Sequence, residues 1–414
     1  MEKTKPFNIP KQLFVQAYKL VKANAGAAGI DEETLEDFAK DLRSNLYKLW
    51  NRMSSGSYFP PAVKAVPIPK KSGGERILGI PTVADRIAQM VVKLVFEPNV
   101  EPHFHPDSYG YRPNKSALDA ISITRRRCWQ YDWLLEYDIR GLFDNIDHQL
   151  LMRAVRKHTD NKWVLLYIER WLITPMQLPD GTLTKKARGV MQGGVISPVL
   201  SNLFLHYVFD SWMTRNFSKM PWCRYADDGL VHCKTEAEAQ QIRRQLETRF
   251  MECGLEMHPD KTKIAYCKDS NRKRDYQNTS FDFLGFTFRP REAKNQANNL
   301  RFTSFTPAAS KSAMKSMRAK IKKCRLGRRT ELSLEDIAER CNPSLRGWIN
   351  YYGQYHITEM ESVFRHFNQT LVKWAMRKYK RLNKTKAIEF LSNLAKEEPG
   401  LFIHWSRGRP GAFA

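Results

Sequence analysis

The sequence predicts an α+β fold in which short strands alternate with helices and a helical region follows. Three observations predict it. Apolar, β-prone runs bounded by turn residues recur between residues 61 and 295. Stretches with helical spacing of apolar residues separate these runs. From Ser310 onward the chain shows only helical, strongly basic stretches. A length of 414 residues leaves room for two or three domains with substantial cores.

The charge of the chain predicts a polyanionic partner. Lys and Arg number 68 against 43 Asp and Glu, which gives a formal net charge of +25. Counterion release makes nucleic acid the leading candidate, and a membrane surface is the alternative. No apolar run reaches the roughly 20 residues of a membrane span, and residues 1–6 do not resemble a secretory signal. The seven cysteines form no C-x-x-C pair, which favours reduced thiols in a cytosolic protein.

Residues 1 to about 55 are expected to be mainly helical, with Asp31 as the cap of a helix that restarts after a glycine-containing loop. Residues 65–81 predict two strands joined by a Ser-Gly-Gly turn, with Lys70 and Arg76 on its arms. Both cations would reach the phosphate oxygens of a triphosphate. The alternative is a solvated surface hairpin.

Helices are predicted over residues 82–96 and from Ser116 to about Arg127, and an apolar strand over residues 133–139. The strand ends on Asp138, and a carboxylate at the end of a buried strand is a common position for a metal ligand. Asp147 is better explained as the cap of the helix that follows it.

Two adjacent carboxylates, Asp227 and Asp228, lie between short apolar flanks and predict a β-hairpin with both acids at its turn. Adjacent aspartates repel each other unless cations neutralise them, and Mg²⁺ or Mn²⁺ prefers such hard oxygen ligands. The alternative is an ordinary Asp-Gly turn with solvated carboxylates. Asp138, about 90 residues earlier, offers the third acid that favours a metal site. Flanking helices are expected over residues 200–212 and 236–253.

Between these acids, Gln192 precedes the paired glycines Gly193 and Gly194. Paired glycines before a helix let the backbone approach a ligand, and a glutamine can hydrogen-bond a base or sugar. The alternative is a simple helix entry capped by Ser197. Strands are also expected within residues 254–264 and 281–288.

The helices after Ser310 carry basic side chains interleaved with aromatic ones. A lone run of charges is usually a solvated helix face. Here Trp348, Tyr351 and Trp374 accompany the charges, which supports contact with RNA or DNA through phosphates and stacking.

Taken in this order, the blocks resemble a reverse transcriptase of the group II intron type, also called an intron-encoded maturase. The resemblance covers roughly residues 20 to 382. It is to the bacterial type that lacks an HNH endonuclease domain, so cleavage of a second DNA strand is not expected. The segments that carry it are Gly26 to Asp31, Ile68 to Pro81, Tyr109 to Pro113, Tyr137 to His148, Tyr225-Ala226-Asp227-Asp228 and Arg346 to Tyr352.

The resemblance implies a right-hand polymerase, with fingers and a palm whose antiparallel sheet packs on helices, followed by an α-helical thumb or maturase domain. The implied domains are a helical N-terminal extension (1–60), the reverse transcriptase fingers and palm (61–295), the thumb or maturase (X) domain (296–385) and a short C-terminal tail (386–414). One residue departs from the family pattern, because Met191 precedes Gln192 where a proline is usual. This change bears on the rigidity of the loop more than on its chemistry.

The resemblance also implies phosphoryl transfer assisted by two Mg²⁺ ions, with Mn²⁺ as a substitute. The implied catalytic residues are Asp138, Asp227 and Asp228, and the same carboxylates with the backbone carbonyl of Ile139 are the implied metal ligands. The implied dNTP contacts are Lys70, Arg76, Phe143, which would exclude a ribose 2′-hydroxyl, Gln192 and Lys261, which is either a proton donor to pyrophosphate or a surface lysine. The implied nucleic-acid contacts are Arg112, Tyr225, Gly285, Lys311, Lys315, Arg318, Arg346, Trp348, Tyr351, Arg377 and Lys380.

The implied function is that of an RNA-directed DNA polymerase that copies RNA into cDNA and binds its group II intron RNA to assist splicing and retrohoming. Its implied partners are an RNA template, a DNA primer, dNTPs, the intron RNA and a DNA target, without a membrane, and a homodimer stays open. The expected location is the bacterial cytoplasm, in association with the nucleoid. The alternatives are a domesticated enzyme of this type that serves host DNA repair or defence, and an RNA-binding splicing factor without polymerase activity.

Overall fold

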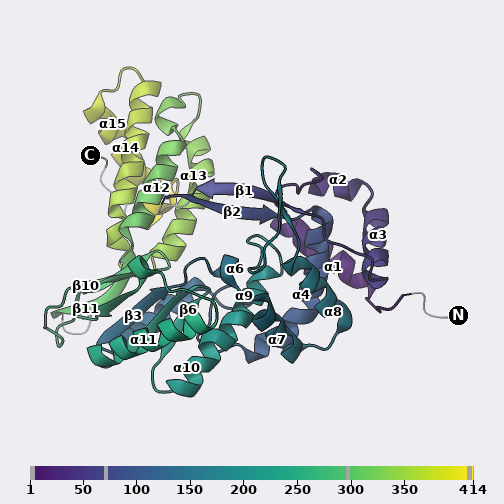
Figure 1. Cartoon of the computed structure of the whole chain (residues 1–414). Helices are drawn as coiled ribbons and strands as arrows, with labels where there is room; N and C mark the ends of the chain where they lie inside the picture. The colour runs from purple at the N-terminus through teal and green to yellow at the C-terminus, as the bar shows by residue number, and fades with distance from the viewer. Residues whose placement is uncertain (1–4, 70–72, 295–298, 408–412, 414) are drawn as a thin grey trace. The chain divides into compact units, whose positions relative to one another are not determined.

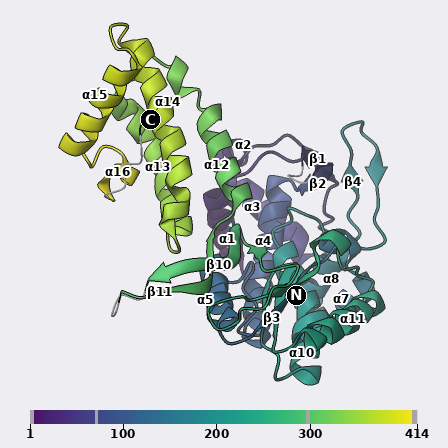
Figure 2. The same cartoon turned by 90° about the vertical axis from the view of Figure 1, so that its left-hand side faces the viewer.

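The computed structural model describes residues 5–69, 73–294, 299–407 and 413, and the chain forms two units in it. The first unit comprises Met1–Ala120 and Leu135–Lys263, and the second comprises Ile121–Leu134 and Ile264–Ala414. Figures 1 and 2 show their elements in two views. The mixture of helices and mainly antiparallel sheets confirms the predicted α+β class. No helix in the described ranges is long and apolar enough to cross a membrane.

The N-terminal part of the first unit is helical, as predicted. An apolar stripe that includes Phe14 and Val21 is buried on α1, which packs against the long α4. The prediction that Asp31 caps the next helix is wrong. Thr34, the last residue before that helix, is its N-cap, and it forms a reciprocal capping box with Asp37. These helices are α1 (Lys11–Asn24), α2 (Leu35–Lys40), α3 (Leu42–Ser54) and α4 (Val83–Val100), after which a short 3-10 turn, η1 (Glu101–His103), follows.

A four-stranded sheet contains the predicted basic hairpin. β1 (Val63–Pro69) and β2 (Glu75–Ile80) pair antiparallel, with Ala65 opposite Gly79. The sequence did not predict that two further strands join them, because β4 (Met176–Gln177) and β5 (Leu183–Thr184) have only two residues each and no alternating pattern. The order is β2-β1-β4-β5. Lys70 lies outside the described residues.

A second four-stranded sheet has the order β6-β7-β3-β8. Its strands are β3 (Trp133–Asp138), β6 (Trp222–Tyr225), β7 (Asp228–Cys233) and β8 (Lys263–Tyr266). The helices around it in the chain are α5 (Ala117–Cys128), α6 (Leu142–Asn145), α7 (His148–His158), α8 (Lys162–Leu172), α9 (Ser197–Leu205), α10 (Ser211–Asn216) and α11 (Glu236–Glu252), and η3 (Pro259–Lys261) precedes β8. Asp147 caps α7 by accepting the Leu150 N–H at 2.8 Å, as predicted.

Two details of these helices differ from the prediction. Ser197 is the first residue of α9, but it is not the cap, and no side chain caps that helix. The single helix expected over residues 200–212 is interrupted by a π-helical turn, η2 (His206–Asp210), between α9 and α10. A π-helical turn contains one residue more than an α-helical turn. This extra residue changes the spacing of the apolar residues too little to be recognised in the sequence. Such turns are frequent at functional sites.

The second unit joins a three-stranded antiparallel sheet to a helical bundle. The strand pair predicted over residues 281–288 is present, but β10 continues to Lys294 and pairs over its whole length with β11, which was not predicted. The strands are β9 (Phe281–Phe283), β10 (Phe286–Lys294) and β11 (Arg301–Ala309), in the order β11-β10-β9. The helices are α12 (Lys311–Lys323), α13 (Leu334–Tyr352), α14 (Glu361–Lys378), α15 (Lys384–Glu397) and α16 (Ile403–Ser406), with short 3-10 turns η4 (Leu326–Arg328) and η5 (Ile357–Met360).

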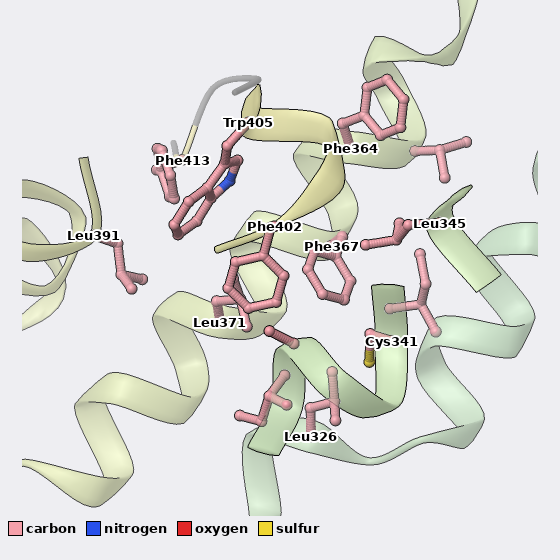
Figure 3. Close-up of a cluster of buried hydrophobic side chains, with 14 of the residues drawn as sticks. Leu326, Cys341, Leu345, Phe364, Phe367, Leu371, Leu391, Phe402, Trp405 and Phe413 are labelled. Atoms are coloured by element: carbon pink, nitrogen blue, oxygen red, sulfur yellow. The ribbon is translucent and has the colours of Figure 1, made fainter. Parts of the chain in front are cut away.

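Several of the last described residues of the chain belong to the core of this bundle. Phe402 is fully buried and Trp405 is 2% exposed, and both lie among side chains from α13 and α14 (Figure 3). The buried His404 accompanies them, and its ring lies 2.9 Å from the Asn368 side-chain oxygen. The segment predicted as a short C-terminal tail therefore contains most of α15 and all of α16, and the domain boundaries stay a prediction.

Replacement of Trp405 by alanine is expected to lower the free energy of unfolding of the second unit by about 3–5 kcal/mol, because it empties a fully packed position. Urea denaturation followed by circular dichroism measures the loss. Met376→Ala on the exposed face of α14 is the control and should change stability by no more than about 0.5 kcal/mol. Equal losses in both variants would contradict the packed C-terminal segment.

Candidate active site

The predicted acidic hairpin forms, but of its two acids only Asp227 lies in the turn, because Asp228 is the first residue of β7. β6 and β7 pair in a register that puts Tyr225 opposite Asp228, so Ala226 and Asp227 form the turn. Ala226 has a positive φ of 55°. Gly110 lies so close that a Cβ on it would overlap the Ala226 nitrogen. Left-handed backbone is costly for a residue with a Cβ, so the surroundings must hold this turn in place.

Asp138 is the last residue of β3 and supplies the third carboxylate. It is 7% exposed, and its charge interacts with those of Asp227 and Asp228. The Asp138 carbonyl accepts the His258 N–H at 2.8 Å, and its carboxylate is in direct contact with the Lys261 ammonium. The structure therefore brings together the three predicted acids and one predicted cation.

Burial and mutual repulsion raise the pKa values of both hairpin acids. For Asp227, burial is the largest cause of the raised pKa and the charge of Asp138 adds to it, while Arg76 and Lys261 act in the opposite direction. Burial, followed by the charges of Asp227 and Asp138, raises the pKa of Asp228 to about 7. Negative charge is therefore in excess at this place, and a bound cation would relieve it.

The chemistry of these donors fits a hard divalent cation. Three carboxylates offer the oxygen ligands that Mg²⁺ and Mn²⁺ prefer. No group of three or more His, Cys, Asp or Glu side chains in the described ranges is already arranged as a metal cage. Magnesium does not need one, because it is usually held by one or two carboxylates together with waters and substrate phosphates. Ile139, the predicted backbone ligand, is buried and bridges to Met257.

A buried ion pair fixes the hairpin to the helices behind it. Arg224 and Asp210 are both fully buried, and the two nitrogens Nε and Nη2 of Arg224 donate to the two Asp210 carboxylate oxygens at 2.8 and 2.7 Å. The remaining donors go to the Asn202 side-chain oxygen at 3.2 Å, the Ser108 hydroxyl at 2.9 Å and the Ala226 carbonyl at 3.0 Å. Each of the guanidinium nitrogens is thus paired, and one bond ends in the hairpin turn itself.

The loop that carries Gln192 is held by β2. The Gly79 N–H donates to the Gln192 carbonyl at 2.7 Å, and a Cβ on Gly193 would overlap the Gly79 carbonyl. The Met191 side chain also packs close to Gly79. Gly79 and Gly193 are therefore both required for the close approach of the loop to the strand, and Met191 takes part in that packing.

Phe143 contacts the start of this loop, and Arg76 lies on the strand that holds it, β2. Phe143 is half-buried, and its carbonyl accepts the Val190 N–H at 2.7 Å. Arg76 is exposed on β2 and interacts electrostatically with Asp227. The predicted dNTP contacts other than Lys70 thus lie in one region of the first unit.

Sequence reasoning missed the residues that position this site. Arg224, Asp210 and Asn202 carry no signal of their own, because a buried ion pair formed by residues on different elements has no fixed spacing. Tyr111 belongs to the segment Tyr109 to Pro113, and no signal of its own marks it as a site residue. It is 54% exposed, and burial, followed by the charge of Asp227, raises its pKa, which places it beside the acids.

The predicted nucleic-acid contacts have different environments. Arg112 is engaged inside the first unit, where it pairs with Glu101 at 2.7 Å and donates to the carbonyls of His105 and Ser108. Tyr225 is half-buried next to the acids. Among the predicted contacts in the described part of the second unit, the side chains of Lys311, Lys315, Arg346 and Lys380 are exposed.

The other predicted nucleic-acid contacts of the second unit are engaged by neighbouring residues or partly buried. Arg377 donates to the Gly327 carbonyl at 2.7 Å, Arg318 donates to the Ser362 hydroxyl at 3.2 Å, and the Tyr351 hydroxyl donates to the Leu284 carbonyl at 2.9 Å. Trp348 is half-buried under Lys320, and Gly285 has a positive φ of 81° beside Tyr352. Trp374 is fully buried, so the expectation that it stacks with nucleic acid is wrong: it faces the core of the bundle.

Comparison with known proteins gives two family matches. Residues 68–288 match the reverse transcriptase (RNA-dependent DNA polymerase) family, and residues 314–389 match the maturase-specific domain of group II introns. Protein YkfC of Escherichia coli strain K12 is 31% identical over 61% of this chain and 77% of its own length. The group II intron-encoded protein LtrA of Lactococcus lactis subsp. cremoris is 32% identical over 47% of this chain, and the match spans about a third, 32%, of LtrA.

Solved structures are also similar. Telomerase from Candida albicans, in complex with a fragment of telomeric RNA, aligns with 88% of this chain and 69% of its own at a TM-score of 0.48 and 12% identity.

Replacement of Arg224 by methionine is expected to lower the free energy of unfolding by about 3–5 kcal/mol, because it leaves the buried Asp210 carboxylate unpaired. The double variant with Asp210→Leu should recover part of this loss, since no buried charge remains. Urea denaturation of the two variants and of wild type measures both effects. A double variant with a lower free energy of unfolding than Arg224→Met would contradict the pairing.

The raised pKa of Asp228 makes the stability of the metal-free protein depend on pH. Its pKa is 3.8 in the unfolded chain and about 7 in the fold, so the fold binds the extra proton over that interval. Stability should therefore fall as pH rises from the lower to the upper value. Thermal melts in EDTA measure this slope, and Asp228→Asn should flatten it. Identical slopes in wild type and variant would contradict the assignment.

Proposed function

The chain belongs to the reverse transcriptase family and carries a group II intron maturase-specific domain, and we propose that it copies RNA into cDNA for such an intron and binds the intron RNA during splicing and retrohoming. The observation that carries this proposal is the acidic hairpin, whose two aspartates meet Asp138 within the matched segment. The domain boundaries implied by the sequence, 1–60, 61–295, 296–385 and 386–414, are part of the proposal.

Asp138, Asp227 and Asp228 are the proposed catalytic residues. Reverse transcriptases generally use divalent metal ions, and we propose Mg²⁺ here, with these carboxylates and the Ile139 carbonyl as its ligands. When bound, the ions would lower the pKa of the primer 3′-hydroxyl and stabilise the pyrophosphate that leaves. The hairpin holds two of the acids at a fixed separation, and the ion pair beneath it prevents their displacement.

The substrate side of the site is proposed to work by charge and shape. Arg76 and Lys261 carry positive charge that acts on the acids, and both would meet the triphosphate of a dNTP. Gln192 borders the nucleotide, and Phe143 limits the space beside the sugar so that a ribose 2′-hydroxyl is disfavoured. The role of Lys70 rests on the sequence alone.

The helices of the second unit are the proposed duplex and intron-RNA contacts. Lys311 and Lys315 lie on the exposed face of α12, and Arg346 lies on the exposed face of α13. Phosphate contacts of this kind make affinity strongly salt-dependent. A DNA target, a homodimer and association with the bacterial nucleoid belong to the same proposal.

Asp227→Asn is expected to abolish primer extension on an RNA template with dNTPs and Mg²⁺, while RNA binding measured by filter retention stays unchanged. The loss should exceed about 10³-fold, because one ligand of the reacting centre is removed while the fold is kept. Asp160→Asn, on an exposed loop between α7 and α8, is the matched control and should retain wild-type synthesis.

Full-length cDNA from Asp227→Asn would overturn the assignment of the catalytic acids. If neither wild type nor Asp160→Asn makes cDNA while both bind RNA tightly, the chain is an RNA-binding splicing factor.

A further inference from the structure

The first unit contains a cavity whose lining includes none of the residues of the acidic hairpin. Its volume is about 370 Å³, and the residues around it come from five elements or their immediate neighbours in the chain. Three of them are histidines, and the π-helical turn η2 supplies two of the seven. The lining residues are Asn99, His103, Lys157, His158, His206, Tyr207 and Ser211.

Contacts between the polar side chains of this pocket hold them in place around it. The His158 ring nitrogen lies 2.7 Å from the Tyr207 hydroxyl, and its ring centroid lies 4.7 Å from that of His103. The His206 Nε2 lies 3.2 Å from the Ser211 hydroxyl. The Lys157 ammonium lies 4.9 Å from the centroid of the Tyr207 ring.

The lining combines one ammonium, that of Lys157, with three imidazoles, and no carboxylate belongs to it. The neighbouring carboxylate of Asp210 lies 3.8 Å from the His206 Nδ1, beyond hydrogen-bond distance, and both of its oxygens are bound by Arg224. The buried His206 Nδ1 has no hydrogen-bond partner among the described residues. Burial, followed by the charges of His103, His206 and Lys157, lowers the pKa of His158 to about 4.

This arrangement differs from that of the acidic hairpin. There, crowded carboxylates raise pKa values and favour a cation. Here, burial and the neighbouring imidazoles and ammonium disfavour protonation of His158, and a bound anion would favour its protonated form. A transition metal is the other ligand that imidazoles prefer, but such sites need about three protein ligands in a fixed geometry. The described residues contain no such group.

We propose that the pocket binds a phosphate group, held by the Lys157 ammonium and by the imidazoles of His103, His158 and His206. A tetrahedral dianion presents oxygens to donors on several walls, as this lining requires, whereas a planar carboxylate carries only one charge and two oxygens. Asn99 and Ser211 supply neutral donors. The volume exceeds that of a phosphate alone, so the pocket has room both for free phosphate and for the terminal phosphate of a nucleic-acid strand.

The site lies outside the proposed catalytic residues, so its occupancy is measured independently of polymerisation. The first arm titrates the full chain with inorganic phosphate and follows the histidine side-chain NMR signals. Saturable shifts of His103 and His158 are expected, with a higher pKa for His158 in the bound state, because the anion favours its charged form. His103, His206, Lys157, Tyr207 and Asp210 are the titratable groups around it.

The second arm distinguishes the source of the phosphate. A short RNA with a 5′-phosphate and the same RNA with a 5′-hydroxyl are compared by the same signals. Shifts with the 5′-phosphate RNA at lower concentrations than with inorganic phosphate would assign a strand end. Equal concentration dependence for the two phosphates, without shifts for the 5′-hydroxyl RNA, would assign free phosphate.

The double variant Lys157→Gln and His158→Gln should weaken phosphate binding at least roughly tenfold, which corresponds to about 1.4 kcal/mol. Lys162→Gln, which removes one positive charge from the exposed start of α8 outside the lining, is the control and should bind as wild type does. Equal affinities in all three proteins, or shifts of the same size with the 5′-hydroxyl RNA, would overturn the proposal and leave general attraction to a basic surface.

Discussion

The buried ion pair between Arg224 and Asp210 is the constraint on which the acidic hairpin depends. Two charges removed from water are tolerated only when their geometry is good and their other donors are satisfied. Both conditions hold here, because each of the guanidinium nitrogens has a partner and the carboxylate is held through both oxygens. Since one of these bonds ends on the Ala226 carbonyl, the left-handed turn that presents Asp227 cannot relax without breaking the network. Strain at the turn is therefore compensated by electrostatics beneath it.

The acidic hairpin and the histidine-lined pocket both adjoin this pair. The acids lie on the hairpin side, where Lys261 contacts Asp138 and partly offsets the negative charge. The histidines lie on the side of η2, where Arg224 already occupies the nearest carboxylate. Binding of a divalent cation by Asp138 would release the Lys261 ammonium from its contact. This ammonium would then be available to a substrate phosphate.

The features that the sequence predicted are those encoded by a few neighbouring residues. Asp-Asp-Gly between apolar flanks predicted the hairpin, and an apolar run that ends on Asp138 predicted the third acid, because strand, turn and carboxylate are all encoded within a few residues. The Arg224 network could not be predicted, since its partners come from residues 108, 202 and 210 and are brought together only by folding. Trp374 shows the opposite error. Its position among basic residues suggested stacking, but helical periodicity alone did not show which side of α14 faces the core. The strands β4, β5 and β11 were missed because pairing partners, rather than alternating patterns, determine them.

The path from the histidine-lined pocket to the hairpin is short but stiff. His206 approaches Asp210, Asp210 holds Arg224, and Arg224 bonds the turn at Ala226. A ligand shifts a conformational equilibrium only to the extent that it binds two conformations differently. Occupancy of the pocket therefore affects the hairpin only if η2 can move to a second arrangement. With both Asp210 oxygens bound to Arg224, such a move would have to carry the carboxylate and the guanidinium together. Since that displacement would break several buried hydrogen bonds at once, the arrangement favours a rigid hairpin and a pocket whose binding energy is used for attachment rather than for switching.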